Sequence, residues 1–222
     1  MTPANGFDRR EFLRRSGLAA ASAAVLAGCG SGGGPGALLK STTTPTTVEG
    51  GAPSSADIVI LRTASSVERL AVDVYTSAFD SGLAKSVALA DALRLFRDHH
   101  REHADLFERT TKKLGGEPFA KANPVVMATL DPAVKGLRDE KGVAQLAYDL
   151  ETMAAATYLA VVGAFNDRTL NKTSMGVGSV EARHAAVLAN LLSTTFGTRT
   201  DAVPPDGVLK RDKAVAAGTG VK

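Results

Sequence analysis

Apolar residues recur at alternating steps of three and four positions in four stretches of the chain. This period places them on one face of an α-helix. The stretches predict helices at residues 55–81, 86–114, 142–168 and 172–197. No alternating pattern typical of β-strands stands out between them, so we expect an all-α fold.

Ionisable residues interrupt each predicted apolar face, at positions where apolar side chains belong. A buried carboxylate costs several kcal/mol unless it is paired or bound to a cation. We therefore expect the side chains at these positions to converge in one core. They are Glu68, His100, His103, Glu151, Glu181 and His184.

The two halves of the helical region carry the same spacing of residues. Tyr75 follows Glu68 by seven positions, and Tyr158 follows Glu151 by seven. A His-Ala pair comes 35 residues after Glu68 and 33 residues after Glu151. The repetition predicts two copies of one helical hairpin. At a rise of about 1.5 Å per residue, the Glu and the His of each hairpin meet near its middle.

The connections between the predicted helices indicate how the hairpins are joined. Residues 80–82 and 166–171 break the two hairpins, because they are rich in Asp, Asn and Gly. The long segment between the hairpins contains Pro118, Pro124 and Pro132, and we expect a short helical turn near 132–137. Two hairpins joined by one long crossover form a ferritin-like four-helix bundle, expected at residues 55–197.

The first 29 residues are interpreted as an export signal. Residues 9–14, Arg-Arg-Glu-Phe-Leu-Arg, resemble the twin-arginine motif that directs folded proteins out of the bacterial cytoplasm. The apolar stretch after it is too short to span a bilayer. Residues 26–29, Leu-Ala-Gly-Cys, look like a lipobox, so Cys29 is the predicted lipidation site. The alternative is a plain signal peptide with a chance cysteine.

Composition and charge indicate where the helical domain is held in the cell and exclude nucleic-acid binding. Residues 30–54 are rich in Gly, Ser, Thr and Pro and predict a flexible tether, and residues 198–222 predict an irregular C-terminal tail. The expected partners are the twin-arginine export machinery and a membrane surface, reached through the lipid anchor. The expected location is the outer face of the cytoplasmic membrane, or the periplasm or cell envelope. The net charge is +3, and residues 1–28 contribute +2 of it, so the rest of the chain is close to neutral. Nucleic-acid binding is therefore not expected, because it relies on a strongly basic surface. Cys29 is the sole cysteine, so no disulfide forms within the chain.

The core residues resemble the ligand set of the ferritin-like superfamily, in particular its exported bacterial members. Members with a carboxylate-bridged metal pair use one Glu from each of two helices and a Glu-x-x-His from each of the other two. Glu68 and Glu151 match the single glutamates, and residues 181–184 match one Glu-x-x-His. Helix 86–114 departs, because His100 stands where the second motif has Glu. Glu102 points off this face and cannot replace it.

The resemblance implies metal binding. Oxygen and nitrogen ligands suit iron, manganese and zinc. We expect iron or manganese, as one or two ions, with possible reactions towards Fe²⁺, oxygen or peroxide. The alternative is a metal-free scaffold or interaction module, in which Glu68 pairs with His103 and Glu151 with His184.

Three further side chains near the predicted ligands have less specific interpretations. Tyr75 and Tyr158 either hydrogen-bond near a metal or pack in the core with their hydroxyl groups satisfied. His99 is expected to be a flanking or surface residue and not a ligand.

Overall fold

The computed structural model describes residues 54–198 and 211–221, which all belong to one unit of the chain, Val48–Lys222. The predicted export signal at 1–29, with Cys29, lies outside the described residues. So does the predicted tether at 30–54, except for Ser54, and so does part of the predicted tail.

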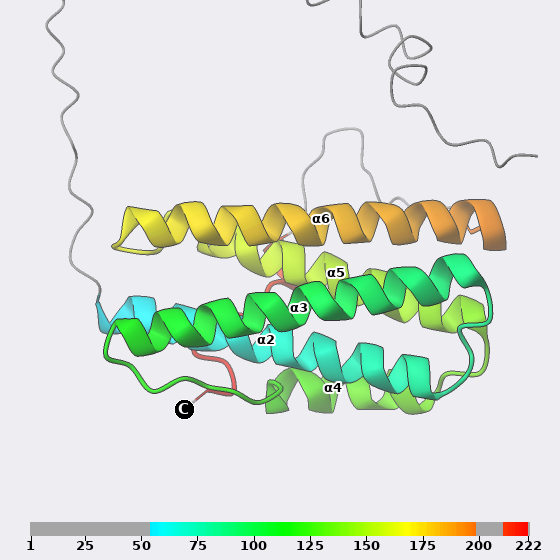
Figure 1. The fold of residues 1–222 in the computed structure, drawn as a ribbon, viewed down its shortest axis with the longest axis horizontal. Coiled ribbons are helices and arrows are strands. Elements are labelled where there is room, and N and C mark those ends of the chain that lie inside the picture. Colours follow the sequence, from blue (N-terminus) through cyan, green and yellow to red (C-terminus); the bar gives the residue numbers. More distant parts are fainter. Residues whose placement is uncertain (1–53, 199–210, 222) are drawn as a thin grey trace, which may run out of the picture. The chain divides into compact units, whose positions relative to one another are not determined.

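Five α-helices and one short 3-10 helix make up the described part of the chain, which contains no strand (Figure 1). The all-helical prediction is confirmed. No helix among the described residues has the length and apolar character needed to cross a membrane. The elements are α2 Ser55–Asp80, α3 Val87–Lys113, α4 Pro124–Lys135, α5 Glu140–Val161, α6 Arg168–Phe196 and η1 Arg211–Lys213.

Each α-helix begins at a residue whose side chain accepts a hydrogen bond from a free backbone N–H of the first turn. The first of them has a full capping box, since Ser54 accepts from the N–H of Asp57 while the Asp57 carboxylate accepts from the N–H of Ser54. The other capping residues are Ser86, Asn123, Asp139 and Asp167. Gly197 ends α6 with a φ of 63°, a left-handed conformation that favours glycine.

The turn between α5 and α6 lies earlier than the sequence indicated. α5 ends at Val161 and not at residue 168. Gly163 has a φ of 81°, and its N–H donates to the side-chain oxygen of Asn171, 2.8 Å away. Asn171 therefore does not interrupt the helix as predicted. It lies at the start of α6, and its side chain stabilises the connection between α5 and α6 by accepting this hydrogen bond.

The segment between the hairpins contains a full helix, α4, where only a short turn was predicted. Pro124 occupies its first turn, where proline is tolerated. Asn123 is fully buried, and its N–H donates to the carbonyl oxygen of Ser66 at 2.9 Å. The side-chain Nδ2 of Asn123 also donates to Ser66 Oγ at 2.9 Å, so backbone and side chain together fix the start of α4 against α2.

The long helices pack in pairs, α2 with α3 and α5 with α6, and the pairs meet where α2 contacts α5 and α3 contacts α6 (Figure 1). The apolar core falls into two clusters along the helices. One contains Leu70, Leu93 and Leu188, and the other contains Leu61 and Phe107. On each of the four long helices, apolar residues of the two clusters lie on either side of the predicted ionisable residues, so apolar layers flank the polar centre at both ends.

The described C-terminal segment, 211–221, docks on the helices near one of these layers. The N–H of Val215 donates to Thr157 Oγ1 at 3.0 Å, and the N–H of Gly218 donates to Thr63 Oγ1 at 2.8 Å. The side chains of Val215 and Val221 are buried. The segment therefore covers part of α2 and part of α5.

Candidate metal centre

The structure brings all six sequence-predicted side chains together between the four long helices. Glu68 comes from α2, Glu151 from α5, and the remaining residues come from α3 and α6. Four of the six are fully buried, namely Glu68, His100, Glu151 and Glu181. His184 is buried, and the His103 side chain retains 14% of its accessible surface. The six predicted residues therefore form one polar centre in an apolar surrounding.

The candidate ligand atoms fall into two groups of four, each with all of its atoms within 4.8 Å of one another. We call the first the His103 group, which consists of Glu68, His100, His103 and Glu181. We call the second the His184 group, which consists of His100, Glu151, Glu181 and His184. The groups share His100 and Glu181, the two residues at the middle of the centre.

The imidazole of His100 lies between two carboxylates from different helix pairs. Its Nδ1 is 2.5 Å from Glu68 Oε2, and its Nε2 is 3.0 Å from Glu151 Oε1. The pairs expected for a metal-free core are also present but longer. His103 Nδ1 lies 3.6 Å from Glu68 Oε2, and His184 Nδ1 lies 3.3 Å from Glu151 Oε2. His100 is therefore the central partner of both glutamates.

Two buried atoms of the His103 group have no hydrogen-bond partner, namely His103 Nδ1 and Glu181 Oε1. The two atoms are 2.9 Å apart, but their directions do not form a hydrogen bond. Buried polar atoms are rarely left unpartnered. A nitrogen and an oxygen that converge in this way fit a cation bound between them, and oxygen and nitrogen donors suit iron, manganese or zinc.

The ring of His184 is held on three sides. Its Nδ1 is 3.0 Å from Glu181 Oε2, and its Nε2 is 2.9 Å from Nδ1 of His99. The Phe96 ring stacks on it with 3.9 Å between centroids. His99 is thus half-buried and in contact with a candidate ligand, a flanking position and not a surface one. This contact could not be predicted from the sequence, because His99 lies off the apolar face of α3.

The two tyrosines hydrogen-bond the glutamates across the helix pairs. The hydroxyl of Tyr75 on α2 donates to Glu151 on α5, and the hydroxyl of Tyr158 on α5 donates to Glu68 on α2. Burial, together with the charge of the bonded glutamate, raises the pKa of each tyrosine well above its usual value. Both tyrosines are therefore neutral donors that orient a carboxylate, in addition to packing in the core.

The charges in the centre shift each other's pKa values. Burial raises the pKa of Glu68, but the charge of His100 and its hydrogen bond outweigh burial and bring it down to about 2. Burial lowers the pKa of His103, but the nearby carboxylates of Glu181 and Glu68 outweigh burial and raise the pKa to about 9. The pKa of His100 is raised well above its usual value, because the surrounding glutamates outweigh burial. Without a metal, imidazolium and carboxylate groups thus neutralise one another here.

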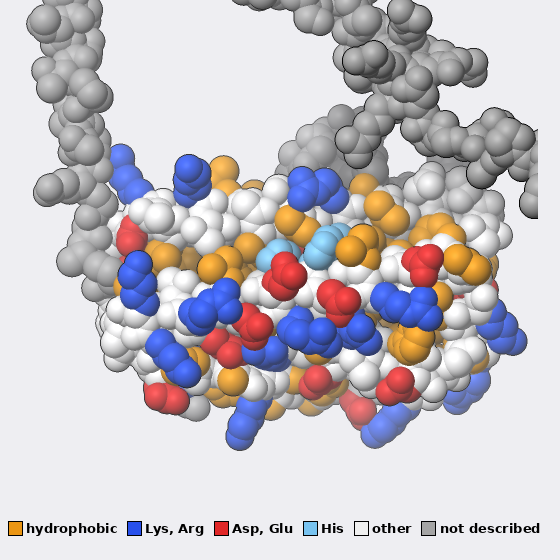
Figure 2. Space-filling view, in the orientation of Figure 1, with side chains coloured by type: hydrophobic (Ala, Val, Ile, Leu, Met, Phe, Trp, Pro, Cys, Tyr) orange, Lys and Arg blue, Asp and Glu red, His pale blue; other side chains and the backbone are white. Residues whose placement is uncertain are grey.

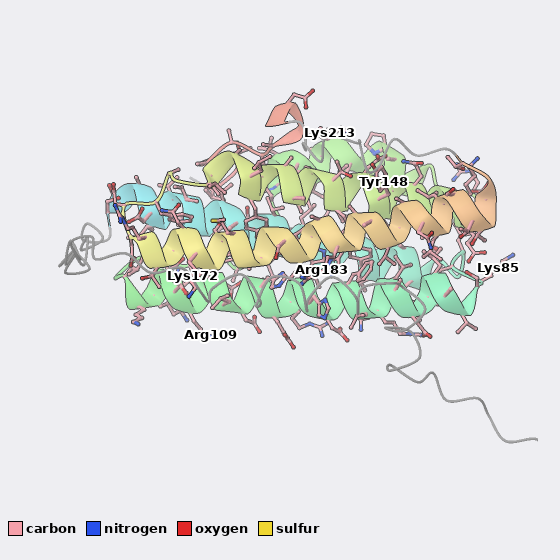
Figure 3. The ribbon with its side chains drawn as sticks, turned by 90° about the horizontal axis from the view of Figure 1, so that it is seen from above. Lys85, Arg109, Tyr148, Lys172, Arg183 and Lys213 are labelled. Atoms are coloured by element: carbon pink, nitrogen blue, oxygen red, sulfur yellow. The ribbon has the colours of Figure 1, made fainter. Side chains whose placement is uncertain are left out.

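The centre is closest to solvent between α3 and α6. Figure 2 shows histidine side chains at the surface between these helices, beside acidic and apolar side chains. Those of His99 and His103 are partly exposed. Arg183, labelled near the middle of α6 in Figure 3, is exposed and is not part of the centre. Of the six residues of the centre, His103 has the most exposed side chain.

The comparisons with known proteins agree with this geometry. The family model described as "Ferritin-like domain" matches residues 56–194, which include all six residues of the centre. No significant match was found among curated proteins or among solved structures. The match covers more than half of the chain, and the chain therefore belongs to the ferritin-like domain family.

Proposed function

We propose that the protein binds iron or manganese between its helices and is an exported, lipid-anchored protein of the cell envelope. The observation that carries the metal proposal is the pair of unpartnered atoms, His103 Nδ1 and Glu181 Oε1, in a group of four converging donors. We also propose that α2–α3 and α5–α6 are the two hairpins of a ferritin-like four-helix bundle, with the α4 segment as the long crossover.

The proposed ligands are the six residues of the centre, with His100 at the position where related metal sites have Glu. A bound iron or manganese ion supplies one-electron chemistry, suited to oxidation of Fe²⁺ as substrate or to reduction of oxygen or peroxide. Tyr158 holds Glu68 and Tyr75 holds Glu151 in fixed orientations through their hydroxyl groups. The two apolar clusters exclude water from both ends of the centre.

The alternative function is a metal-free scaffold or interaction module. One observation favours it, since His100 contacts both Glu68 and Glu151 within hydrogen-bond distance and can neutralise them as an imidazolium. Such a core needs no cation. It leaves His103 Nδ1 and Glu181 Oε1 2.9 Å apart as an ion pair without a hydrogen bond, however, and for this reason we favour the metal-binding function.

Metal removal is expected to lower the melting temperature. An ion present at 100 times its dissociation constant stabilises the folded state by about 2.7 kcal/mol. For a domain of this size, that corresponds to roughly 5–10 °C. The full chain is loaded anaerobically with Fe²⁺ or Mn²⁺, its metal content is measured, and its melting temperature is compared with and without chelator.

A pair of variants shows whether this shift comes from the centre. Glu181→Gln removes the shared carboxylate and is expected to abolish the shift. Glu102→Gln changes an exposed carboxylate on α3 and is expected to retain it. Absence of bound metal in the wild-type protein, with the same melting temperature in chelator, would support the metal-free alternative.

Cys29→Ser is expected to move the protein from the membrane fraction to the soluble fraction. The proposal of lipid anchoring rests on the Leu-Ala-Gly-Cys sequence at residues 26–29, which follows the twin-arginine motif. An acyl anchor contributes about 0.8 kcal/mol per buried CH₂ group, so its loss removes most of the membrane affinity. Fractionation of cells that express the full chain measures this, and Ser31→Ala is the control. Equal membrane association of Cys29→Ser and wild type would contradict the anchor.

A further inference from the structure

We infer that the centre binds one ion, which is held by the His103 group. The ligand atoms of the His184 group are instead occupied by hydrogen bonds within the protein, and in this sense the group is closed. This inference rests on the proposed function, because it assumes that a metal binds. It adds the number of ions and assigns four of the six donors as ligands. It starts from His100, whose side chain is shared by both groups.

A neutral imidazole has one nitrogen lone pair, because its other nitrogen carries a proton. A glutamate at the same position has two oxygens, each of which can bind an ion. His100 points Nδ1 towards Glu68 and Nε2 towards Glu151, one nitrogen into each group. Neutral His100 can therefore serve an ion in one group only, and its N–H then donates into the other group.

The hydrogen bonds show which group is closed. Glu151 accepts from the hydroxyl of Tyr75 and faces Nε2 of His100 with the same oxygen, Oε1. Its other oxygen, Oε2, faces Nδ1 of His184, which also lies 3.0 Å from Glu181 Oε2. Every ligand atom of the His184 group thus already has a partner within the protein.

The His103 group is the open one. His103 Nδ1 and Glu181 Oε1 have no hydrogen-bond partner, and Glu68 Oε2 lies 3.6 Å from His103 Nδ1. His100 Nδ1 and Glu68 Oε2 are 2.5 Å apart, and a proton between them is released when an ion takes its place. His103 is also the candidate ligand with the most exposed side chain, so this group lies nearer to solvent.

The inference is tested by anaerobic titration of the full chain with Mn²⁺, with bound metal measured after dialysis and the electron paramagnetic resonance spectrum recorded. We expect one Mn²⁺ per chain with the spectrum of an isolated ion. Two ions per chain, or the spectrum of an exchange-coupled pair, would overturn the inference but leave the proposed function intact. No bound Mn²⁺ or Fe²⁺ would overturn both.

Two isosteric variants distinguish the groups. Glu68→Gln changes the His103 group and should weaken Mn²⁺ binding by at least about 100-fold. Loss of a residue that only supports a ligand costs up to about 100-fold, and Glu68 is itself a proposed ligand. Glu151→Gln changes the His184 group, where Gln can still accept from Tyr75 and His100, and should weaken binding by no more than about 10-fold, the lower end of the range for a residue that supports a ligand. Equal losses in both variants would overturn the assignment, and circular dichroism verifies that both are folded.

His100→Glu provides a gain-of-binding test that does not depend on loss of affinity. It creates a Glu-x-x-His motif in α3 and gives each group its own carboxylate oxygen. This variant is expected to bind two Mn²⁺ per chain and to show the spectrum of a coupled pair. Arg101→Gln, one position away on the exposed face of α3, is the control and is expected to bind one. A single ion in His100→Glu would show that the shared imidazole does not set the number of ions.

Discussion

His100→Leu is expected to lower the free energy of unfolding of the metal-free protein by about 3–5 kcal/mol, the usual cost of breaking a buried ion pair. His100 is fully buried and is the closest basic partner of both Glu68 and Glu151. Leucine has a similar volume but no charge and no N–H group. The two carboxylates then keep their tyrosine donors but lose their central cation, or take up protons at a cost in free energy.

Chemical denaturation in the presence of a chelator measures this effect, and the melting temperature is expected to fall by roughly 6–20 °C. Glu102→Leu on the same helix is the matched control, since Glu102 is exposed and lies outside the centre. Adding Glu68→Gln to His100→Leu should recover part of the loss, because it removes one of the uncompensated charges. A loss below about 1 kcal/mol, within the range of an ordinary surface change, would show that His100 does not neutralise the glutamates.

Gly178→Leu is expected to lower the free energy of unfolding by about 3 kcal/mol, the upper end of the overpacking range. A Cβ at Gly178 would lie 2.6 Å from Cβ of Tyr158, so α5 and α6 would have to move apart. Because Tyr158 donates to Glu68, the same displacement would disturb the orientation of a proposed ligand.

Gly176→Leu is the matched control for this close approach. Gly176 lies on the same helix, two residues earlier, and a Cβ there meets no atom within 4 Å. Replacing a helical glycine by a good helix former is expected to stabilise the protein by about 0.5–1 kcal/mol. Equilibrium denaturation of both variants should therefore give changes of opposite sign. Equal changes would mean that α5 and α6 do not depend on the absence of a side chain at Gly178.

The helices could be predicted well from the sequence, but their ends could not. The periodic apolar positions located all four long helices, because one buried face imposes a period close to 3.6 residues. The end of α5 and the length of α4 were wrong. In both places an asparagine decides the boundary through a partner elsewhere, Asn171 with Gly163 and Asn123 with Ser66. The residues alone do not reveal such partners.

The sequence by itself determined that acidic and imidazole groups lie on the inward faces of four helices, and it pointed to the ferritin-like family. Only the tertiary structure decided which groups meet. It placed His100 between Glu68 and Glu151, joined each tyrosine to a glutamate on the other hairpin, and left His103 Nδ1 without a partner. The physical reason is that helical periodicity fixes the direction of a side chain around its own axis. The partner of that side chain depends on how neighbouring helices are shifted and rotated against one another, which is set by the packing of the whole core.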